Sequence, residues 1–311
     1  MKQFEIIITN EFGGVKPKNF LKKTLDVNYN QLIKAIKNKR ISLNGKKIKK
    51  DSILQEGDVV AVWDSSIKQR NQNSKSVISN LDIEVKDLGI KTIFSHNDFL
   101  ILNKTAGVVV QGAYDNSESL SKHLRYLEST NPAFEKLHHA HRLDKDTTGC
   151  LLIGNKTQNI RELNSLFQKG NITKVYTAIC CGSFQKKESE IVLNLARNEE
   201  GKLPKVIVSN SGKETKLKYK VVNEILIDNE MLSIVEIQLI TGFMHQIRVT
   251  MQYLNHPILG DTMYCNNRLN EKFSSEISRQ LLHSSRIEFN WRGKDIKVEA
   301  ELPEDFKQFL G

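Results

Sequence analysis

Apolar positions near the N-terminus recur at helical spacing and then alternate. Residues 17–25 begin with Pro and carry apolar side chains at helical spacing, with lysines between them. A second stripe of the same spacing follows Asn28 in the pattern of a capping box. Alternating apolar residues on both sides of Asn44-Gly45 predict a hairpin, because this dipeptide favours a tight turn between strands. We expect one small domain over residues 14–63.

Beyond this domain, residues 64–80 are polar, which is typical of a flexible linker. From residue 81 onwards, apolar runs of strand length mix with two helical stripes. Helices are expected at 119–129 and 156–168, and strands within 92–104, 174–182, 216–222, 231–240 and 281–289. No strand, helix, strand repeat occurs, so the pattern predicts an α+β fold. The small α/β domain would precede a domain over 81–311, built on a largely antiparallel mixed sheet flanked by helices.

The composition is that of an ordinary globular protein. The 311 residues are 39% hydrophobic and 26% charged, and this length fits two domains. The first apolar run is too short for a signal peptide and no run reaches transmembrane length, so no membrane contact is expected. The four cysteines show no CxxC pairing, which fits a reduced cytosol. We expect a cytoplasmic monomer.

The net charge of +10 is concentrated at the N-terminus. Residues 1–63 hold 13 Lys and Arg against 6 Asp and Glu, a balance of +7, whereas residues 81–311 contribute only +1. A compact basic domain joined to a nearly neutral one is typical of an attachment that grips phosphates. A solvated lysine-rich surface would have the same composition, so charge favours a nucleic acid partner without identifying it.

The stretch HRLDKDTTGCLLI, residues 141–153, is the strongest candidate for chemistry. Asp144 lies between Arg142 and Lys145, with two threonine hydroxyls and Gly149 behind it. Nearby positive charge and hydroxyl donors favour an oriented carboxylate, as a nucleophile or general base requires. Alternatively, an Asp before Thr-Thr-Gly is a turn residue that bonds to its own backbone.

Two later segments offer further polar groups. Lys174 and Tyr176 share one face of a predicted strand, so Tyr176 is a candidate to enter a cavity; an ordinary amphipathic strand is the alternative. Residues 241–261 predict a glycine turn followed by a helix with His245, Arg248 and Gln252 on one face. That face would either deliver a basic group to a site or be solvated.

Several histidines are candidate metal ligands. His139 and His141 lie on one side of an extended segment, and His245, His256 and His283 occur elsewhere. However, the chain has no HExxH motif and no cysteine pair at ligand spacing. A metal site is therefore not expected.

Four blocks in order resemble the RluA-type pseudouridine synthase family. The family's HRLD, two variable residues and TSG correspond to HRLDKDTTG, and its tyrosine block to KVYTA. Its TGRxHQIR and HPILGD correspond to TGFMHQIR and HPILGD, and its terminal LLHA to LLHS. The helices, NG hairpin and GDVV strand of residues 14–63 resemble the S4 RNA-binding domain. The resemblance covers nearly the whole chain and is closest to the C type of ribosomal large-subunit synthase.

This resemblance implies that a uridine in RNA is isomerised to pseudouridine without a cofactor or metal. Asp144 would be the catalytic carboxylate, Tyr176 would stack on the base and help to remove the C5 proton, and Arg248 would pair with Asp144. Arg142 would fill the stack left by the flipped base. Other expected substrate contacts are His141, Thr148, His245 and Gln246. Expected RNA contacts of the S4-like domain are Lys18, Lys22, Lys34, Lys37, Arg40, Lys46 and Lys47.

Several alternatives stay open at this level. Asp144 would either attack ribose C1′ or assist a glycal intermediate. Phe243 stands where the family motif has arginine, so one phosphate or loop contact is expected to be missing, and Thr148 replaces Ser but keeps a hydroxyl. A non-catalytic RNA-binding or ribosome-assembly factor is the second hypothesis. Ribosomal RNA is the favoured substrate, with transfer RNA next.

Overall fold

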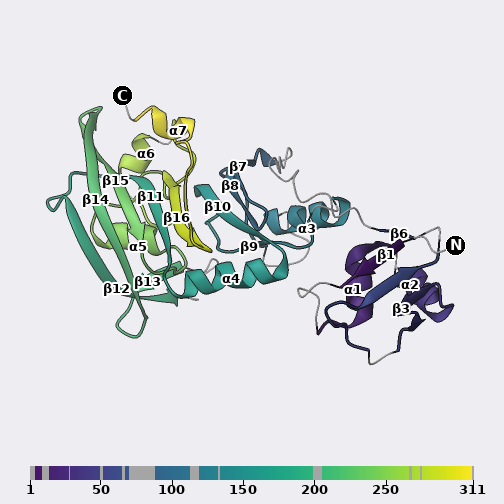
Figure 1. Ribbon diagram of the computed structural model, residues 1–311. Helices are drawn as coiled ribbons and strands as arrows, with labels where there is room; N and C mark the ends of the chain where they lie inside the picture. The colour runs from purple at the N-terminus through teal and green to yellow at the C-terminus, as the bar shows by residue number, and fades with distance from the viewer. Residues whose placement is uncertain are drawn as a thin grey trace. The chain divides into compact units, whose positions relative to one another are not determined.

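The computed structural model describes residues 4–8, 14–27, 29–49, 52–64, 67–69, 88–112, 119–131, 134–198, 205–265, 268–273 and 275–309 (Figure 1). The chain divides into two compact units, residues 1–78 and residues 79–311. Each unit has a hydrophobic core of its own.

In the N-terminal unit, two helices share a core with an antiparallel sheet. Its described elements are β1 (Phe4–Ile7), α1 (Pro17–Thr24), β2 (Leu25–Asp26), α2 (Tyr29–Lys37), β3 (Ile41–Leu43), β4 (Lys46–Lys47), β5 (Val59–Val62) and β6 (Lys68–Gln69). The strand order is β1-β5-β3-β4. Phe20 of α1, Leu32 of α2 and Val60 of β5 are buried together. The predicted helices and hairpin are confirmed, and Asn44 and Gly45 have φ of 49° and 71°, as a tight hairpin turn requires.

This unit is larger than the sequence predicted. β1 precedes residue 14 and pairs with β5, and β6 pairs with β2 although it lies in the expected linker. Ile67, just before β6, is 2% exposed in the same core. One apolar residue in a polar stretch has no periodicity, which is why this contact was not foreseen. Asn28 and the rest of the expected linker, apart from Asp64, lie outside the described residues.

The larger unit is built on one mixed sheet. Its described elements are β7 (Lys91–Ser95), β8 (Phe99–Lys104), α3 (Leu120–Thr130), β9 (Leu137–His139), β10 (Thr148–Asn155), α4 (Thr157–Gln168), β11 (Ile172–Cys181), β12 (Glu188–Asn198), β13 (Lys205–Val208), β14 (Lys213–Ile227), β15 (Glu230–Leu239), α5 (Gln246–Tyr253), α6 (Arg268–Lys272), β16 (Leu282–Trp291), β17 (Lys294–Glu299) and α7 (Glu304–Lys307). The strand order is β13-β12-β14-β15-β11-β16-β10-β8-β7, with β17 beside β16 and β9 beside β10.

Among the described strands of this sheet, only β10 and β16 pair in parallel, at Thr148 and Gly149. The predicted strands are present, as are the helices predicted at 119–129, at 156–168 and within 241–261. The predicted α+β fold with a largely antiparallel mixed sheet is therefore confirmed.

Both faces of β8, the strand next to the β7 edge, are buried. On β8, Leu100 and Leu102 belong to one core, whereas Phe99 and Ile101 belong to another, because successive side chains of a strand point to opposite faces. Helices α3 and α5 contribute to the first core, and Leu163 of α4 contributes to the second. The helices thus flank the sheet on two sides (Figure 1).

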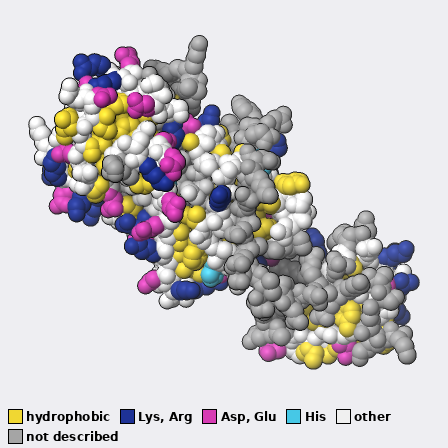
Figure 2. Space-filling model, turned by 90° about the horizontal axis from the view of Figure 1, so that it is seen from above, with side chains coloured by type: hydrophobic (Ala, Val, Ile, Leu, Met, Phe, Trp, Pro, Cys, Tyr) yellow, Lys and Arg dark blue, Asp and Glu magenta, His cyan; other side chains and the backbone are white. Residues whose placement is uncertain are grey.

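Towards the other edge, the sheet is more exposed. Val192 of β12 and Val222 and Leu226 of β14 are at least 50% exposed. In Figure 2, surface hydrophobic side chains lie among Lys, Arg, Asp and Glu side chains. No helix in the described ranges is long and apolar enough to span a membrane.

Candidate active site

One cavity of about 800 Å³ in the larger unit is lined by seven of the eight predicted catalytic and substrate-binding residues, all except Thr148. Among the described residues that line it, Asp144 is the only carboxylate. The Lys and Arg side chains in the lining are Arg142, Lys145, Lys174, Lys213 and Arg248. The cavity is therefore strongly basic although the total charge of residues 81–311 is nearly neutral. Such a cavity suits an anionic ligand.

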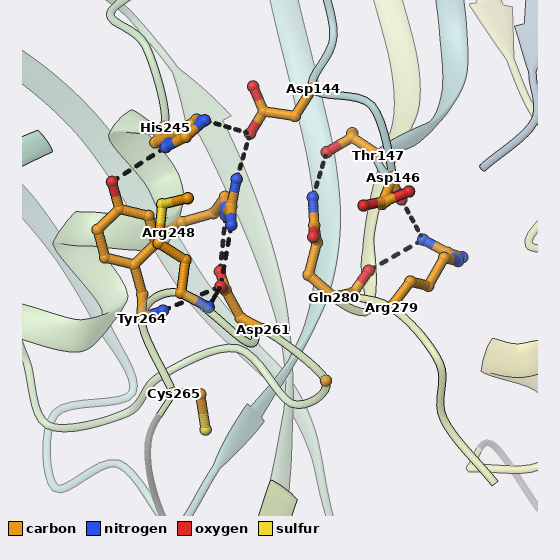
Figure 3. Close-up of polar contacts among 12 residues, drawn as sticks. Asp144, Asp146, Thr147, His245, Arg248, Asp261, Tyr264, Cys265, Arg279 and Gln280 are labelled. Atoms are coloured by element: carbon orange, nitrogen blue, oxygen red, sulfur yellow. Dashed lines mark hydrogen bonds and ion pairs between the residues drawn. The ribbon is translucent and has the colours of Figure 1, made fainter. Parts of the chain in front are cut away.

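Asp144 lies in a turn between β9 and β10, and two buried basic side chains donate hydrogen bonds to carbonyl groups of this turn. Lys104, at the end of β8, is 0% exposed and donates from Nζ to two carbonyl oxygens of the turn at 2.7 and 2.9 Å. Arg279 Nη1 donates to the carbonyl of Asp146 at 2.9 Å (Figure 3). The amide of Thr147 donates to the carbonyl of Asp144 at 3.1 Å. Asp144 is thus both a turn residue and a cavity carboxylate.

Arg248 pairs with Asp144, as the resemblance implied, but binds a second carboxylate more closely (Figure 3). Its Nη1 donates to Asp144 at 3.1 Å, while Nε and Nη2 donate to the two oxygens of Asp261 at 2.6 and 2.9 Å. Burial alone would lower the pKa of Arg248, but the hydrogen bonds and charge of Asp261, with Asp144 adding to them, raise it. The guanidinium is therefore a fixed cation beside Asp144.

His245 was expected to share a helix face with Arg248 and Gln252, and this was wrong. Helix α5 begins at the next residue, and His245 caps it in a left-handed conformation with φ of 54°. Its ring nitrogens lie 4.0 Å from Asp144 and 3.0 Å from the hydroxyl of Tyr264, whereas Gln252 is exposed. Burial lowers the pKa of His245 although Asp144 opposes this, so the ring is neutral at neutral pH.

Tyr176 lines the cavity and is 5% exposed. The pairing of β11 with β16 shifts register between Val175 and Thr177, and such irregularities redirect side chains. Burial raises the pKa of Tyr176, and the charge of Asp144 raises it further, so the hydroxyl is protonated at neutral pH.

Thr148 was expected to contact substrate, but its side chain points elsewhere. It is not among the lining residues, and its hydroxyl lies 2.8 Å from Nδ1 of buried His283. Next to it, Gly149 has φ of 103°, and a Cβ there would lie 2.2 Å from the carbonyl oxygen of Ser284. The parallel pairing of β10 with β16 imposes this close approach. Thr148 and Gly149 therefore hold these two strands together.

The remaining expected substrate contacts reach the cavity in different ways. Arg142 is exposed at the lining. His141 also lines the cavity, where its Nε2 accepts a hydrogen bond from a backbone amide of β10 at 3.1 Å. Gln246 is 2% exposed, and its Oε1 accepts from the amide of Phe243 at 3.1 Å. His141 and Gln246 thus shape the cavity wall.

Most of the predicted RNA contacts of the N-terminal unit are exposed at its surface. Exposed members are Lys22, Lys34, Lys37, Arg40, Lys46 and Lys47, and Lys18 is half-buried. Arg40 differs from the lysines because its positive charge is paired: its Nη1 donates to the carboxylate of Asp64 at 2.9 Å.

In the described part of the chain, no group of three or more His, Cys, Asp or Glu side chains is placed to hold a metal ion. Burial is the main cause that lowers the pKa of His139 and of His283 to about 4 and that of His141 to about 3. These histidines are therefore neutral at neutral pH.

Sequence reasoning missed three residues that organise the site: Lys104, Asp261 and Arg279. In the sequence, Lys104 is only the last residue of a predicted strand, and Asp261 is only the last residue of the HPILGD motif. The available signal for Lys104 and Asp261 was a charged residue one position beyond an apolar run, since such a residue is buried only with partners. The partners lie 13 to 133 positions away in the chain, beyond any local pattern.

Comparison with known proteins shows which family the chain belongs to. Residues 98–253 match the model of the RNA pseudouridylate synthase family. The ribosomal large subunit pseudouridine synthase C of Rickettsia bellii is 31% identical over 281 residues, covering 88% of this chain and 90% of that protein. Its namesake from Vibrio parahaemolyticus is 27% identical over 304 residues, covering 96% and 92%.

The fold has solved counterparts as well. The structure of human RNA pseudouridylate synthase domain containing 1 aligns with a TM-score of 0.58 at 24% identity, over 69% of this chain and 84% of that one. The family match spans half of the chain and includes Asp144, Tyr176 and Arg248. The chain therefore belongs to the RNA pseudouridylate synthase family and is an isomerase of that family.

Proposed function

We propose that this enzyme converts uridines of large-subunit ribosomal RNA into pseudouridine, with Asp144 as its catalytic carboxylate. The observation that carries the proposal is the position of Asp144. It is the only carboxylate among the described lining residues, and it lies 3.1 Å from the guanidinium of Arg248, which Asp261 also binds. The names of the relatives from Rickettsia bellii and Vibrio parahaemolyticus support the choice of ribosomal RNA.

In the proposed reaction, the bond between uracil N1 and ribose C1′ breaks, the base rotates, and C5 is joined to C1′. Asp144 either attacks C1′ or removes a ribose proton on the way to a glycal. Both routes need a carboxylate held at the sugar, and the turn contacts of Lys104 and Arg279 supply that rigidity. The detached uracil carries negative charge, which the cations of the lining would stabilise.

Tyr176 would stack on the uracil and assist the loss of the C5 proton. Its raised pKa keeps the hydroxyl protonated in the free enzyme. One cause of that shift is the charge of Asp144, which disappears if Asp144 bonds to C1′. The hydroxyl would then ionise more easily at the stage when a base for C5 is needed.

The RNA must present its uridine outside a helix stack. Arg142 is exposed at the cavity and is proposed to occupy the vacated stack, which offsets part of the few kcal/mol that base flipping costs. The exposed lysines of residues 14–63, proposed as an S4-like domain, would hold the RNA backbone. A monomer acting in the cytoplasm is part of this proposal.

Mapping of pseudouridine after incubation with purified protein tests the function. Unmodified large-subunit ribosomal RNA and unmodified transfer RNA serve as parallel substrates. We expect new pseudouridine in the ribosomal RNA. Modification of transfer RNA alone would overturn the substrate, and binding without modification of either would favour the assembly-factor alternative.

A further inference from the structure

Lys174 on β11 lies in the cavity wall without an acidic partner. In the part of the chain that the structure describes, no carboxylate lies within ion-pair distance of its ammonium group. Its Nζ instead lies 5.6 Å from the ring centroid of Phe167. Arg248, the other partly enclosed cation of the cavity, has two carboxylates.

Burial lowers the pKa of Lys174 to about 8, and no neighbouring charge opposes this shift. An enclosed cation without a counter-charge lowers the stability of a fold. Binding of an anion from outside the protein would supply the missing counter-charge and remove this destabilisation. Asp144 is the only carboxylate among the described lining residues, whereas five side chains there are Lys or Arg, so the lining favours the entry of an anion.

Space for a ligand is present at the ammonium group. Gly242 lies opposite Lys174 in the lining, and a Cβ added there would meet only Lys174 Nζ, at 3.8 Å. The φ of Gly242 lies outside the left-handed region, so the backbone does not require glycine at this position. A larger side chain at residue 242 would cover the ammonium group.

The position of Lys174 relative to Tyr176 indicates which anion fits. The two residues are two positions apart on one strand and line the same cavity, so their side chains start about 6–7 Å apart. This spacing is comparable to the separation between the base of a nucleotide and a phosphate attached to its sugar. Lys213 lines the cavity as well and is exposed.

We propose that Lys174 binds a phosphodiester group of the RNA strand adjacent to the uridine that stacks on Tyr176. The contact is a charge-assisted hydrogen bond from Nζ to a phosphate oxygen. Gly242 leaves the approach open, and Lys213 supplies a second positive charge. This inference rests on the proposed function, because it assigns the orientation of the RNA strand within the same cavity.

Steady-state kinetics on unmodified large-subunit ribosomal RNA tests the proposal in the full-length protein. Lys174→Met is expected to raise KM about tenfold with kcat within about threefold, because a contact made before and during the reaction is lost. The slope of log KM against log salt should fall by about 0.7 to 0.9, the value of one phosphate contact. Lys174→Arg should restore most of the affinity. The control is Lys220→Met, an exposed lysine of β14 outside the cavity lining.

A second pair of measurements separates a phosphate contact from a purely structural role. The kcat/KM of the wild type should fall as pH rises through about 8, since a neutral amine does not attract phosphate, whereas Lys174→Arg should lack this fall. Gly242→Val should raise KM without changing the urea midpoint.

Unchanged KM and salt slope in Lys174→Met, or loss of kcat alone, would overturn the role of Lys174. An inactive wild type on every RNA would instead overturn the proposed function.

Discussion

Asp261 holds Arg248 more tightly than Asp144 does. Two parallel hydrogen bonds of 2.6 and 2.9 Å join Arg248 to Asp261, against one of 3.1 Å to Asp144. Asp261 is 0% exposed, and backbone amides of Met263 and Tyr264 fix it in turn. Asp144 thus contacts a cation whose position is fixed by Asp261.

Asp261→Asn should therefore disable the site and weaken the fold. Breaking a buried ion pair typically costs about 3–5 kcal/mol, because a charge is left without its partner. We expect a lower urea midpoint and a kcat reduced at least about a hundredfold, since Arg248 would lose its fixed orientation. Glu301→Gln is the matched control, an exposed carboxylate outside the cavity. Full activity in a stably folded Asp261→Asn protein would contradict this account.

Lys104→Met should misplace the turn that carries Asp144. The substitution leaves two turn carbonyls without their donor, each at a cost of about 1–3 kcal/mol. kcat is expected to fall more than the affinity for RNA, because the lining itself stays basic. Kinetics together with urea unfolding would check this. Equal kcat in Lys104→Met and wild type would show that the turn keeps its shape without Lys104.

Stability should fall on mild acidification. The pKa of His139 and of His283 is about 4 in the folded protein, against 6.5 for the free side chain, so the unfolded chain binds more protons between those values. The free energy of unfolding should decrease as pH drops through this window, by about 1–2 kcal/mol for each histidine between pH 7 and pH 5. Urea titrations at several pH values measure the slope. His283→Gln should flatten it, because the substitution removes one of the two buried histidines.

The lysines of the N-terminal unit should govern the salt dependence of RNA binding. Replacing exposed Lys22, Lys34 and Lys37 with Gln in the full chain is expected to weaken binding and to lower the log–log salt slope by about 2 to 3. Filter binding across salt concentrations would measure it. The same change at Lys186, Lys220 and Lys294, exposed lysines of the larger unit, is the control. Equal slopes for both triple variants would contradict a dedicated RNA-binding unit.

The sequence predicted those parts of the protein that depend on local patterns. Periodicity gave the hairpin at Asn44-Gly45 and the main strands, and the motif around Asp144 gave the position of the site. It could not show that Thr148 turns to His283, because that contact depends on strands 135 positions apart. Nor could total charge reveal the basic cavity, since acidic residues elsewhere in the larger unit balance it.

The most direct test of the central claim is tritium release from ribosomal RNA that carries uridine labelled at C5. Asp144→Asn should release none, while keeping the wild-type urea midpoint. Glu301→Gln, which changes an exposed carboxylate outside the cavity lining, should release tritium as the wild type does. Release by a folded Asp144→Asn protein at the wild-type rate would contradict the assignment of Asp144 as the catalytic carboxylate.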